Sequence, residues 1–157
     1  MKPIKSSTHI NGRPPAAVAA ALLAPDNAVK WQSNLERCEL AAGRPGEVGA
    51  KLHLHFAPKG RPCHMMEEVV EYAEPNRRYV SRITGDGIVV KVETLLTGTP
   101  QGTQITVLWS GECPSFWLRL LLRIARSSIA ERAEIDLQKF KRLVEAPDPG
   151  LPSPNRQ

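Results

Sequence analysis

The chain has 157 residues, of which 41 % are hydrophobic, so it is long enough for one domain with a buried core and too apolar to be wholly disordered. Its net charge of +5 comes from basic residues scattered among acidic ones, a pattern that argues against a nucleic-acid-binding surface. No apolar run approaches the roughly 20 residues that a membrane span requires, and the N-terminus shows no signal peptide. We therefore expect no stable membrane insertion. Three widely spaced cysteines without a CxxC motif suit a reducing compartment, so we expect a cytoplasmic protein.

Turn-forming residues divide the first 112 positions into a strand, two short helices and six further strands. The first strand is expected at residues 3–11. Two short helices are expected at residues 16–24 and 25–32, because each segment has proline at its first turn. The later connections, such as the turn at 74–76, are short enough to form hairpins, so the sheet of seven strands is antiparallel. The six later strands are expected at residues 34–41, 48–57, 63–73, 78–84, 88–97 and 103–112.

A long helix is predicted at residues 114–146, because neither glycine nor proline occurs between Pro114 and Pro147. Some 30 residues give a rod of roughly 45 Å, whereas a strand of eight or nine residues spans only about 28 Å. The fold class is therefore α+β, with a curved antiparallel sheet wrapped around this helix in one domain over residues 1–146. Residues 147–157 form a proline-rich tail with too little apolar content to become ordered.

Strand alternation identifies the side chains that face the helix. In the strand at 48–57, Val48, Ala50, Leu52, Leu54 and Phe56 share one face, which we take as the inner one. Because several inward positions are small, we expect a cavity between sheet and helix, although a filled core with its polar members paired remains the alternative. Continuing the alternation through the hairpins adds Cys63, Met65, Glu67, Val69, Tyr79, Ser81, Ile83, Val90, Val92, Thr94, Ile105, Val107 and Trp109 to the inner face.

Among the inward positions, Glu67 is the strongest candidate for a catalytic role. An acid that faces an apolar cavity has its charged form disfavoured and can donate a proton. However, residues 65–70 consist of three identical pairs (MMEEVV). A single β-bulge would therefore turn Glu68 inward in place of Glu67. A solvated strand glutamate is the simpler interpretation, and we prefer it at this stage.

The sequence offers little support for a metal, a cofactor or an activated nucleophile. His53, His55 and His64 could meet on one face of a hairpin and hold zinc, but alternation puts them on the outer face of the sheet, where no closed site is evident. There is no Gly-x-Ser-x-Gly motif and no phosphate-binding glycine loop. We therefore expect neither a bound metal nor a cofactor.

The first half of the long helix, residues 116–124, is apolar almost all round, whereas its second half has only an apolar stripe. The additional apolar surface would suit a homodimer contact, a membrane-facing patch or a gate for the cavity. The simpler interpretation, which we favour, is that the two short helices and a sheet edge cover it.

Several short phrases of the chain resemble those of a known family. They are Trp31 at the end of the second short helix, residues 45–49 (PGEVG) before the third strand, residues 71–78 (EYAEPNRR) before the fifth, Gly102-Thr103 before the last strand, and a closing L-x-x-F-K-x-L-V-E at 137–145. Together with the element order they resemble the helix-grip fold of the START-like superfamily, also called SRPBCC, over roughly residues 3–146. This superfamily includes bacterial proteins labelled polyketide cyclase/dehydrase. The resemblance implies a START-like ligand-binding domain and is not specific for any activity.

Three functions follow from these patterns. The first is binding of a small hydrophobic molecule, such as a lipid, polyketide or aromatic compound, in the cavity. The second, which the resemblance makes possible, is a cyclase or dehydratase with Glu67 and Tyr79 as proton-transfer groups. The third is a protein-interaction module that uses the apolar half of the helix. The expected ligand contacts are Leu54, Phe56, Met65, Glu67, Tyr79, Ser81, Val92, Thr94, Val107 and Trp109, with Leu121 and Ala125 from the helix.

Overall fold

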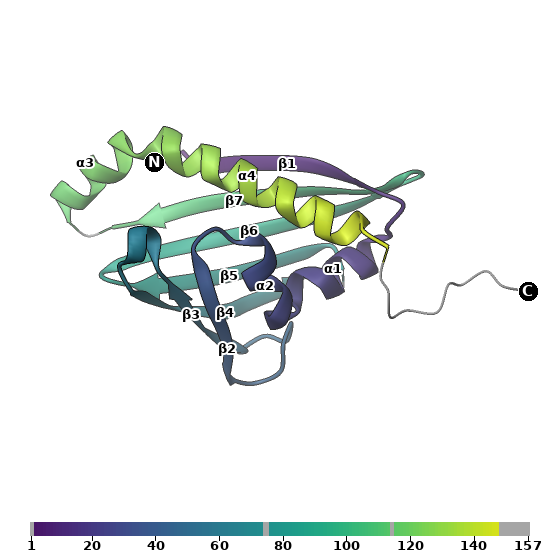
Figure 1. The fold of residues 1–157 in the computed structure, drawn as a ribbon, viewed down its shortest axis with the longest axis horizontal. Helices are drawn as coiled ribbons and strands as arrows, with labels where there is room; N and C mark the ends of the chain where they lie inside the picture. The colour runs from purple at the N-terminus through teal and green to yellow at the C-terminus, as the bar shows by residue number, and fades with distance from the viewer. Residues whose placement is uncertain (1, 74–75, 114, 148–157) are drawn as a thin grey trace, which may run out of the picture.

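A curved antiparallel sheet of seven strands dominates the computed structural model, which describes residues 2–73, 76–113 and 115–147 (Figure 1). Its spatial order is β1-β7-β6-β5-β4-β3-β2, so β2 to β7 form consecutive hairpins and β1 joins the sheet beside β7. The predicted fold class is confirmed. The strands are β1 (Ile4–Asn11), β2 (Leu35–Ala42), β3 (Lys51–Phe56), β4 (Cys63–Ala73), β5 (Arg78–Gly85), β6 (Ile88–Thr99) and β7 (Gly102–Glu112), with a 3-10 turn, η1 (Pro58–Gly60), between β3 and β4.

Two short helices follow β1, and two helical segments follow β7. The short ones are α1 (Pro15–Leu23) and α2 (Pro25–Trp31), each with proline in its first turn, where the missing N–H leaves no hydrogen bond unmade. The C-terminal segments are α3 (Phe116–Ile124) and α4 (Arg126–Glu145). The predicted turn at 74–76 lies mostly outside the described residues, as do Pro114 and the tail from residue 148.

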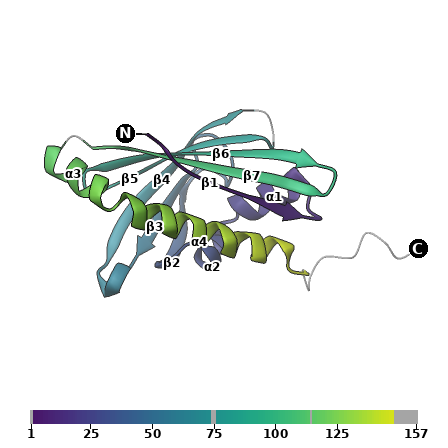
Figure 2. The ribbon, with the colours of Figure 1, turned by 90° about the horizontal axis from the view of Figure 1, so that it is seen from above.

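The single uninterrupted helix predicted at 114–146 is divided at Ala125. The Ala125 N–H still donates to the Leu121 carbonyl at 2.9 Å, and the Ile129 N–H donates to the Ala125 carbonyl at 3.0 Å. The ψ angle of Ala125 is nevertheless −3°, away from the ordinary helical value, so the two segments count as separate helices. Figures 1 and 2 show why the division falls there: α4 lies along the sheet beside β1, whereas α3 continues beyond it.

The strand β3 begins later than the alternation predicts. Gly49 has a left-handed φ of 88°, which ends the extended conformation and turns Val48 outward, so that 61 % of its surface is exposed. The prediction that Val48 faces inward is therefore wrong. Ala50 remains buried because its carbonyl accepts a hydrogen bond from the Val69 N–H at 3.0 Å, which holds it against β4.

The helix α4 is joined at both of its ends to residues that flank β1. At its start, the Arg126 guanidinium donates to the Lys2 and Pro3 carbonyls at 2.7 and 3.0 Å. At its last turn, Arg13 Nε donates to the Val144 carbonyl at 3.0 Å, and this occupies a carbonyl that no later N–H of the helix could reach. The opposite edge strand, β2, pairs with β3 through two register shifts, one between Leu35 and Arg37 and one between Leu40 and Ala42.

The tightest packing lies where α1, β1, β7 and the end of α4 meet. Ile10, Val18, Ile105 and Phe140 are fully buried there, and the ring of Phe140 meets Trp31 edge-on with centroids 5.2 Å apart. A second, smaller cluster lies under α2. It consists of Ala28, Leu35 and Leu54.

Candidate functional site

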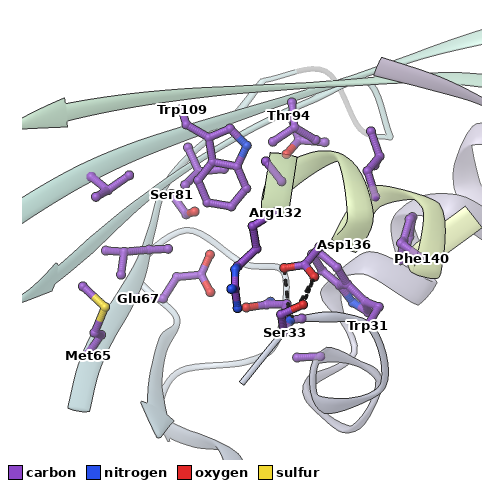
Figure 3. A pocket seen from close by; sticks show the side chains of 18 of the residues that line it. Trp31, Ser33, Met65, Glu67, Ser81, Thr94, Trp109, Arg132, Asp136 and Phe140 are labelled. Atoms are coloured by element: carbon purple, nitrogen blue, oxygen red, sulfur yellow. Dashed lines mark hydrogen bonds between the residues drawn. The ribbon is translucent and has the colours of Figure 1, made fainter. Parts of the chain in front are cut away.

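A cavity of about 780 Å³ lies between the inner face of the sheet, α2 and α4 (Figure 3). At liquid density this space would hold roughly 25 water molecules, far more than the packing defects of an ordinary core. The filled-core alternative is therefore excluded. Most of the wall is apolar, with a few polar groups, which is the usual composition of a small-molecule pocket.

The sheet side of the wall is made mostly of inward residues from β3 to β7, with Ile4 and Ser6 of β1 and Cys38 of β2 at its edges. Their positions follow from the period of two along each strand, carried through the observed antiparallel register. As ligand contacts these residues remain predictions. The expected contacts that line the cavity are Phe56, Met65, Glu67, Tyr79, Ser81, Val92, Thr94, Val107 and Trp109.

Three expected contacts lie elsewhere. Leu54 is inward but is covered by α2, where it packs with the Ala28 cluster instead of lining the cavity. Leu121 is exposed to solvent, and Ala125 lies at the division between α3 and α4 without reaching the wall. The predicted rotation of the helix is wrong, because the most apolar side of residues 116–124 faces solvent and not the sheet. The helical wall instead includes Leu122, Ile129, Ala133 and Leu137.

One side of the cavity is closed by a polar contact that the sequence analysis did not find. The Asp136 carboxylate on α4 accepts a hydrogen bond from the Ser33 N–H at 3.1 Å and another from the Ser33 hydroxyl. Lys139 Nζ donates to the same hydroxyl at 3.0 Å. The loop between α2 and β2 is thereby joined to the helix. The available signal was a charged residue on the inward stripe of Ala133, Leu137 and Phe140.

Glu67 lies on the cavity wall, and its neighbour faces the other way. The Glu68 carboxylate pairs with Arg82 on the outer face at 3.1 Å, and the register shift in β4 falls between Val69 and Glu71, too late to exchange the two acids. Glu67 therefore faces the cavity, where part of its surface stays accessible, and does not lie on the outer face of the sheet. Burial raises the pKa of its carboxyl above the ordinary value, and a hydrogen bond from the Ser81 hydroxyl offsets part of this rise. Glu67 is thus a candidate proton donor within the cavity.

Three buried donors on the wall have no hydrogen-bond partner among the described residues. They are Trp31 Nε1, the Tyr79 hydroxyl and Trp109 Nε1. Burial, and to a smaller extent the neighbouring Tyr72 hydroxyl, raises the pKa of Tyr79, which therefore stays a neutral donor. The two tyrosine rings stack with centroids 4.8 Å apart. Buried donors are nearly always satisfied, and leaving one unpaired costs about 1–3 kcal/mol. The cavity therefore presents hydrogen-bond donors to whatever fills it.

The histidines lie apart from the cavity. His55 Nδ1 is 2.7 Å from His64 Nδ1, and His55 Nε2 is 3.1 Å from a Glu39 oxygen, on the outer face of the sheet. In the part of the chain that the structure describes, no group of three His, Cys, Asp or Glu side chains is placed to hold a metal ion. Over the same residues, no helix has both the length and the apolar character to cross a membrane.

A helix gripped by a curved sheet around an apolar cavity defines a hydrophobic-ligand-binding fold. The chain belongs to the family described as "polyketide cyclase / dehydrase and lipid transport", whose model matches residues 1–145. The resemblance drawn from the turn phrases is thereby confirmed. No curated protein matches the chain at a significant level.

Solved structures share the fold at low sequence identity. Protein CV1439 from Chromobacterium violaceum is 20 % identical, with a TM-score of 0.73 over 94 % of this chain and 100 % of that one. Ara h 8.0201 is 14 % identical, with a TM-score of 0.71 over 90 % and 96 % of the two chains. DynU16, from the dynemicin biosynthetic locus, is 20 % identical, with a TM-score of 0.69 over 92 % of this chain and 48 % of its own. These similarities establish the fold and leave the ligand open.

Proposed function

We propose that this protein binds one small hydrophobic molecule, a lipid, polyketide or aromatic compound with at least one oxygen acceptor, between the sheet and α4. The observation that carries the proposal is an apolar cavity of about 780 Å³ whose wall bears three unpaired donors, on Trp31, Tyr79 and Trp109. The apolar wall favours transfer of a hydrophobic molecule from water. The donors favour a molecule with carbonyl, ether or hydroxyl oxygens over a plain hydrocarbon.

The energetics are sufficient for useful affinity. Burial of about 300 Å² of apolar ligand surface contributes roughly 7 kcal/mol. Loss of translational and rotational freedom offsets part of this, and hydrogen bonds to otherwise unpaired donors add to it. A micromolar dissociation constant, which corresponds to about 8 kcal/mol, is therefore within reach.

Occupation of the cavity can be tested with a fluorescent apolar dye and a matched pair of variants. Val92 faces the cavity from β6, whereas Val70 is exposed on the outer face of β4. We expect 8-anilinonaphthalene-1-sulfonate to bind the wild type and the Val70→Phe variant equally, and to bind Val92→Phe at least tenfold more weakly, because the larger ring fills the space. Native mass spectrometry of the purified protein would identify a co-purified molecule. Equal dye binding by all three proteins would contradict the proposal.

A second function, of cyclase or dehydratase type, is favoured by one observation, the Glu67 carboxyl with a raised pKa on the cavity wall. In a dehydration, Glu67 would protonate a departing hydroxyl group while a base removes the neighbouring proton, and water would leave. Glu67→Gln would keep dye binding and abolish turnover of a β-hydroxy carbonyl compound. A binder without catalysis would show no turnover in either protein.

The proposed compartment is the cytoplasm. Cys38, Cys63 and Cys113 are all free thiols in the structure, which suits a reducing environment. Burial and the negative charge of Glu67, Asp26 and Glu39 raise the pKa of Cys38 to about 11, so this thiol stays protonated and unreactive at neutral pH.

A further inference from the structure

The helix α3 presents a continuous apolar face to solvent. Phe116 is 66 % exposed, Trp117 and Ile124 are each 72 % exposed, and Leu120 and Leu121 are also exposed. At 100° per residue, these five positions fall within one side of the helix. No residue of α3 is buried. Five neighbouring large apolar side chains on one exposed face are unusual for a monomer and indicate an interaction surface.

The two short helices do not cover this face, so the simpler interpretation from the sequence is wrong. Along the described chain, α1 packs against α2, β6 and β7, and α3 packs mainly against α4. Both ribbon views show α3 at the end of the molecule opposite the C-terminal end of α4, away from α1 (Figures 1 and 2). No described part of the chain therefore covers the apolar face.

Both charges that α3 itself carries are positive. Arg119 and Arg123 lie along one border of the face, and the nine residues of α3 include no acid. The hydrogen bonds from Arg126 to Lys2 and Pro3 bring the basic start of the chain close to the beginning of α4. The nearest acid preceding the helix, Glu112, ends β7 and lines a small hollow with Arg119, without an ion pair between them among the described residues.

We propose that α3 docks onto an anionic lipid surface, with its apolar face among the acyl chains and its arginines at the headgroups. Aromatic and leucine side chains on one face with basic residues at its border are the composition of helices that lie in the membrane interface. Nine residues span only about 14 Å, so the helix would lie in the interface and not cross it.

Charge favours a lipid surface over a second copy of the chain. In a two-fold dimer through this face, Arg119 and Arg123 of one copy would approach the same arginines of the other, which is unfavourable without intervening acids. An anionic surface would instead attract each arginine by about 1 kcal/mol.

Docking through α3 would also bring the cavity close to the membrane. Leu122, on the opposite side of α3 from the exposed face, lines the cavity together with Arg126 and Ile129 of α4. An apolar ligand would therefore have a short path between the acyl-chain region and the cavity. This consequence rests on the proposed function, whereas docking itself does not.

The test is vesicle flotation with the full-length protein. Vesicles of equal parts phosphatidylcholine and phosphatidylglycerol should carry the protein, whereas pure phosphatidylcholine vesicles should carry much less, and high salt should release it. Leu121→Glu should weaken binding more than tenfold, because a charge replaces a side chain of the buried face. The double variant Arg119→Gln with Arg123→Gln should weaken it about thirtyfold. The matched control is Ile135→Glu, since Ile135 is an exposed apolar residue of α4 outside the face; it should bind like the wild type.

Three results would overturn the proposal: no flotation of the wild type, equal flotation of the Leu121→Glu variant, or a concentration-dependent dimer that Leu121→Glu dissociates. Binding of 8-anilinonaphthalene-1-sulfonate, measured on the same proteins without vesicles, separates the two proposals. Leu121 does not line the cavity, so dye binding should be unchanged in Leu121→Glu even when flotation is lost.

Discussion

The interior of this protein has a packed end and a hollow end. At the packed end, Ile10, Val18, Ile105 and Phe140 are fully buried where α1, β1, β7 and the end of α4 meet, and Ile105 and Phe140 also form the end wall of the cavity. Toward the start of α4, the same inner face of the sheet borders the cavity, which α2 and α4 cover without filling. A single sheet thus supplies a stabilising core at one end and a binding surface at the other. The difference depends on which helix covers each part, since the strands alternate in the same way throughout.

The largest expected effect is loss of the aromatic ring at the packed end. Phe140→Ala should lower the free energy of unfolding by about 3–5 kcal/mol, because it removes a fully buried ring that packs against Trp31 at the end wall of the cavity. Phe116→Ala is the matched control, since this ring on α3 is exposed, and it should change stability by less than about 0.5 kcal/mol. Urea unfolding measures both. Similar losses in the two variants would show that the packed end is not where stability is concentrated.

A smaller effect of opposite sign is expected at Glu67. Its pKa in the folded state is raised above the ordinary 4.5, so the folded protein retains the proton to higher pH than the unfolded chain. Below about pH 4.5 both states are protonated and Glu67 has no effect on stability. As the pH rises above that value, the unfolded state ionises first and the wild type loses stability until the folded-state pKa is passed.

Glu67→Gln should therefore raise the melting temperature by several degrees at pH 8 and by much less at pH 4, at about 2–4 °C for each kcal/mol. Glu68→Gln, on the outer face, should not reproduce this pH dependence, because its carboxylate pairs with Arg82 in solvent. If the difference in melting temperature between Glu67→Gln and the wild type were the same at pH 4 and pH 8, the Glu67 carboxyl would be solvated.

Two stacked tyrosines at the cavity should respond in opposite directions. The buried Tyr79 hydroxyl has no hydrogen-bond partner among the described residues, so Tyr79→Phe should stabilise the empty protein by about 1 kcal/mol and weaken binding of oxygen-bearing ligands. The Tyr72 hydroxyl accepts a hydrogen bond from the Asn76 N–H at 3.1 Å, so Tyr72→Phe should destabilise by about 1 kcal/mol. Thermal melts of both variants decide this. Destabilisation by Tyr79→Phe would show that its hydroxyl has a partner in the unliganded protein.

The smallest expected effect is the removal of methyl groups beside the cavity. Val92→Ala should cost less than about 1 kcal/mol, because Val92 already borders a void on one side. Val18→Ala, at the packed end, should cost about 2 kcal/mol for the two lost methyl groups and the space they leave. Equal costs in urea unfolding would mean that the cavity is filled or collapsed in solution.

Much of the fold and part of the site could be predicted from the sequence. Turn residues mark where each strand ends, so the order of the strands could be predicted from them. The backbone imposes a period of two along each strand, so the inward positions from Met65 to Trp109 could be predicted as well. Val48 was misplaced because a left-handed glycine interrupts the alternation. The rotation of α3 and the link between Ser33 and Asp136 depend on how distant segments meet, which no local pattern encodes. Whether α3 is covered depends on where α1 lies, and only the folded chain decides this.

The two edges of the sheet are protected in different ways against strand addition by another molecule. Along β1, the helix α4 is bonded at both ends and lies beside the strand. Along β2, two register shifts interrupt the regular spacing of free N–H and carbonyl groups, and Glu36, Arg37 and Glu39 place charges on the strand. An incoming strand could not pair in register with such an edge over its full length. A protein that leaves its interior partly empty can therefore remain resistant to aggregation through its sheet.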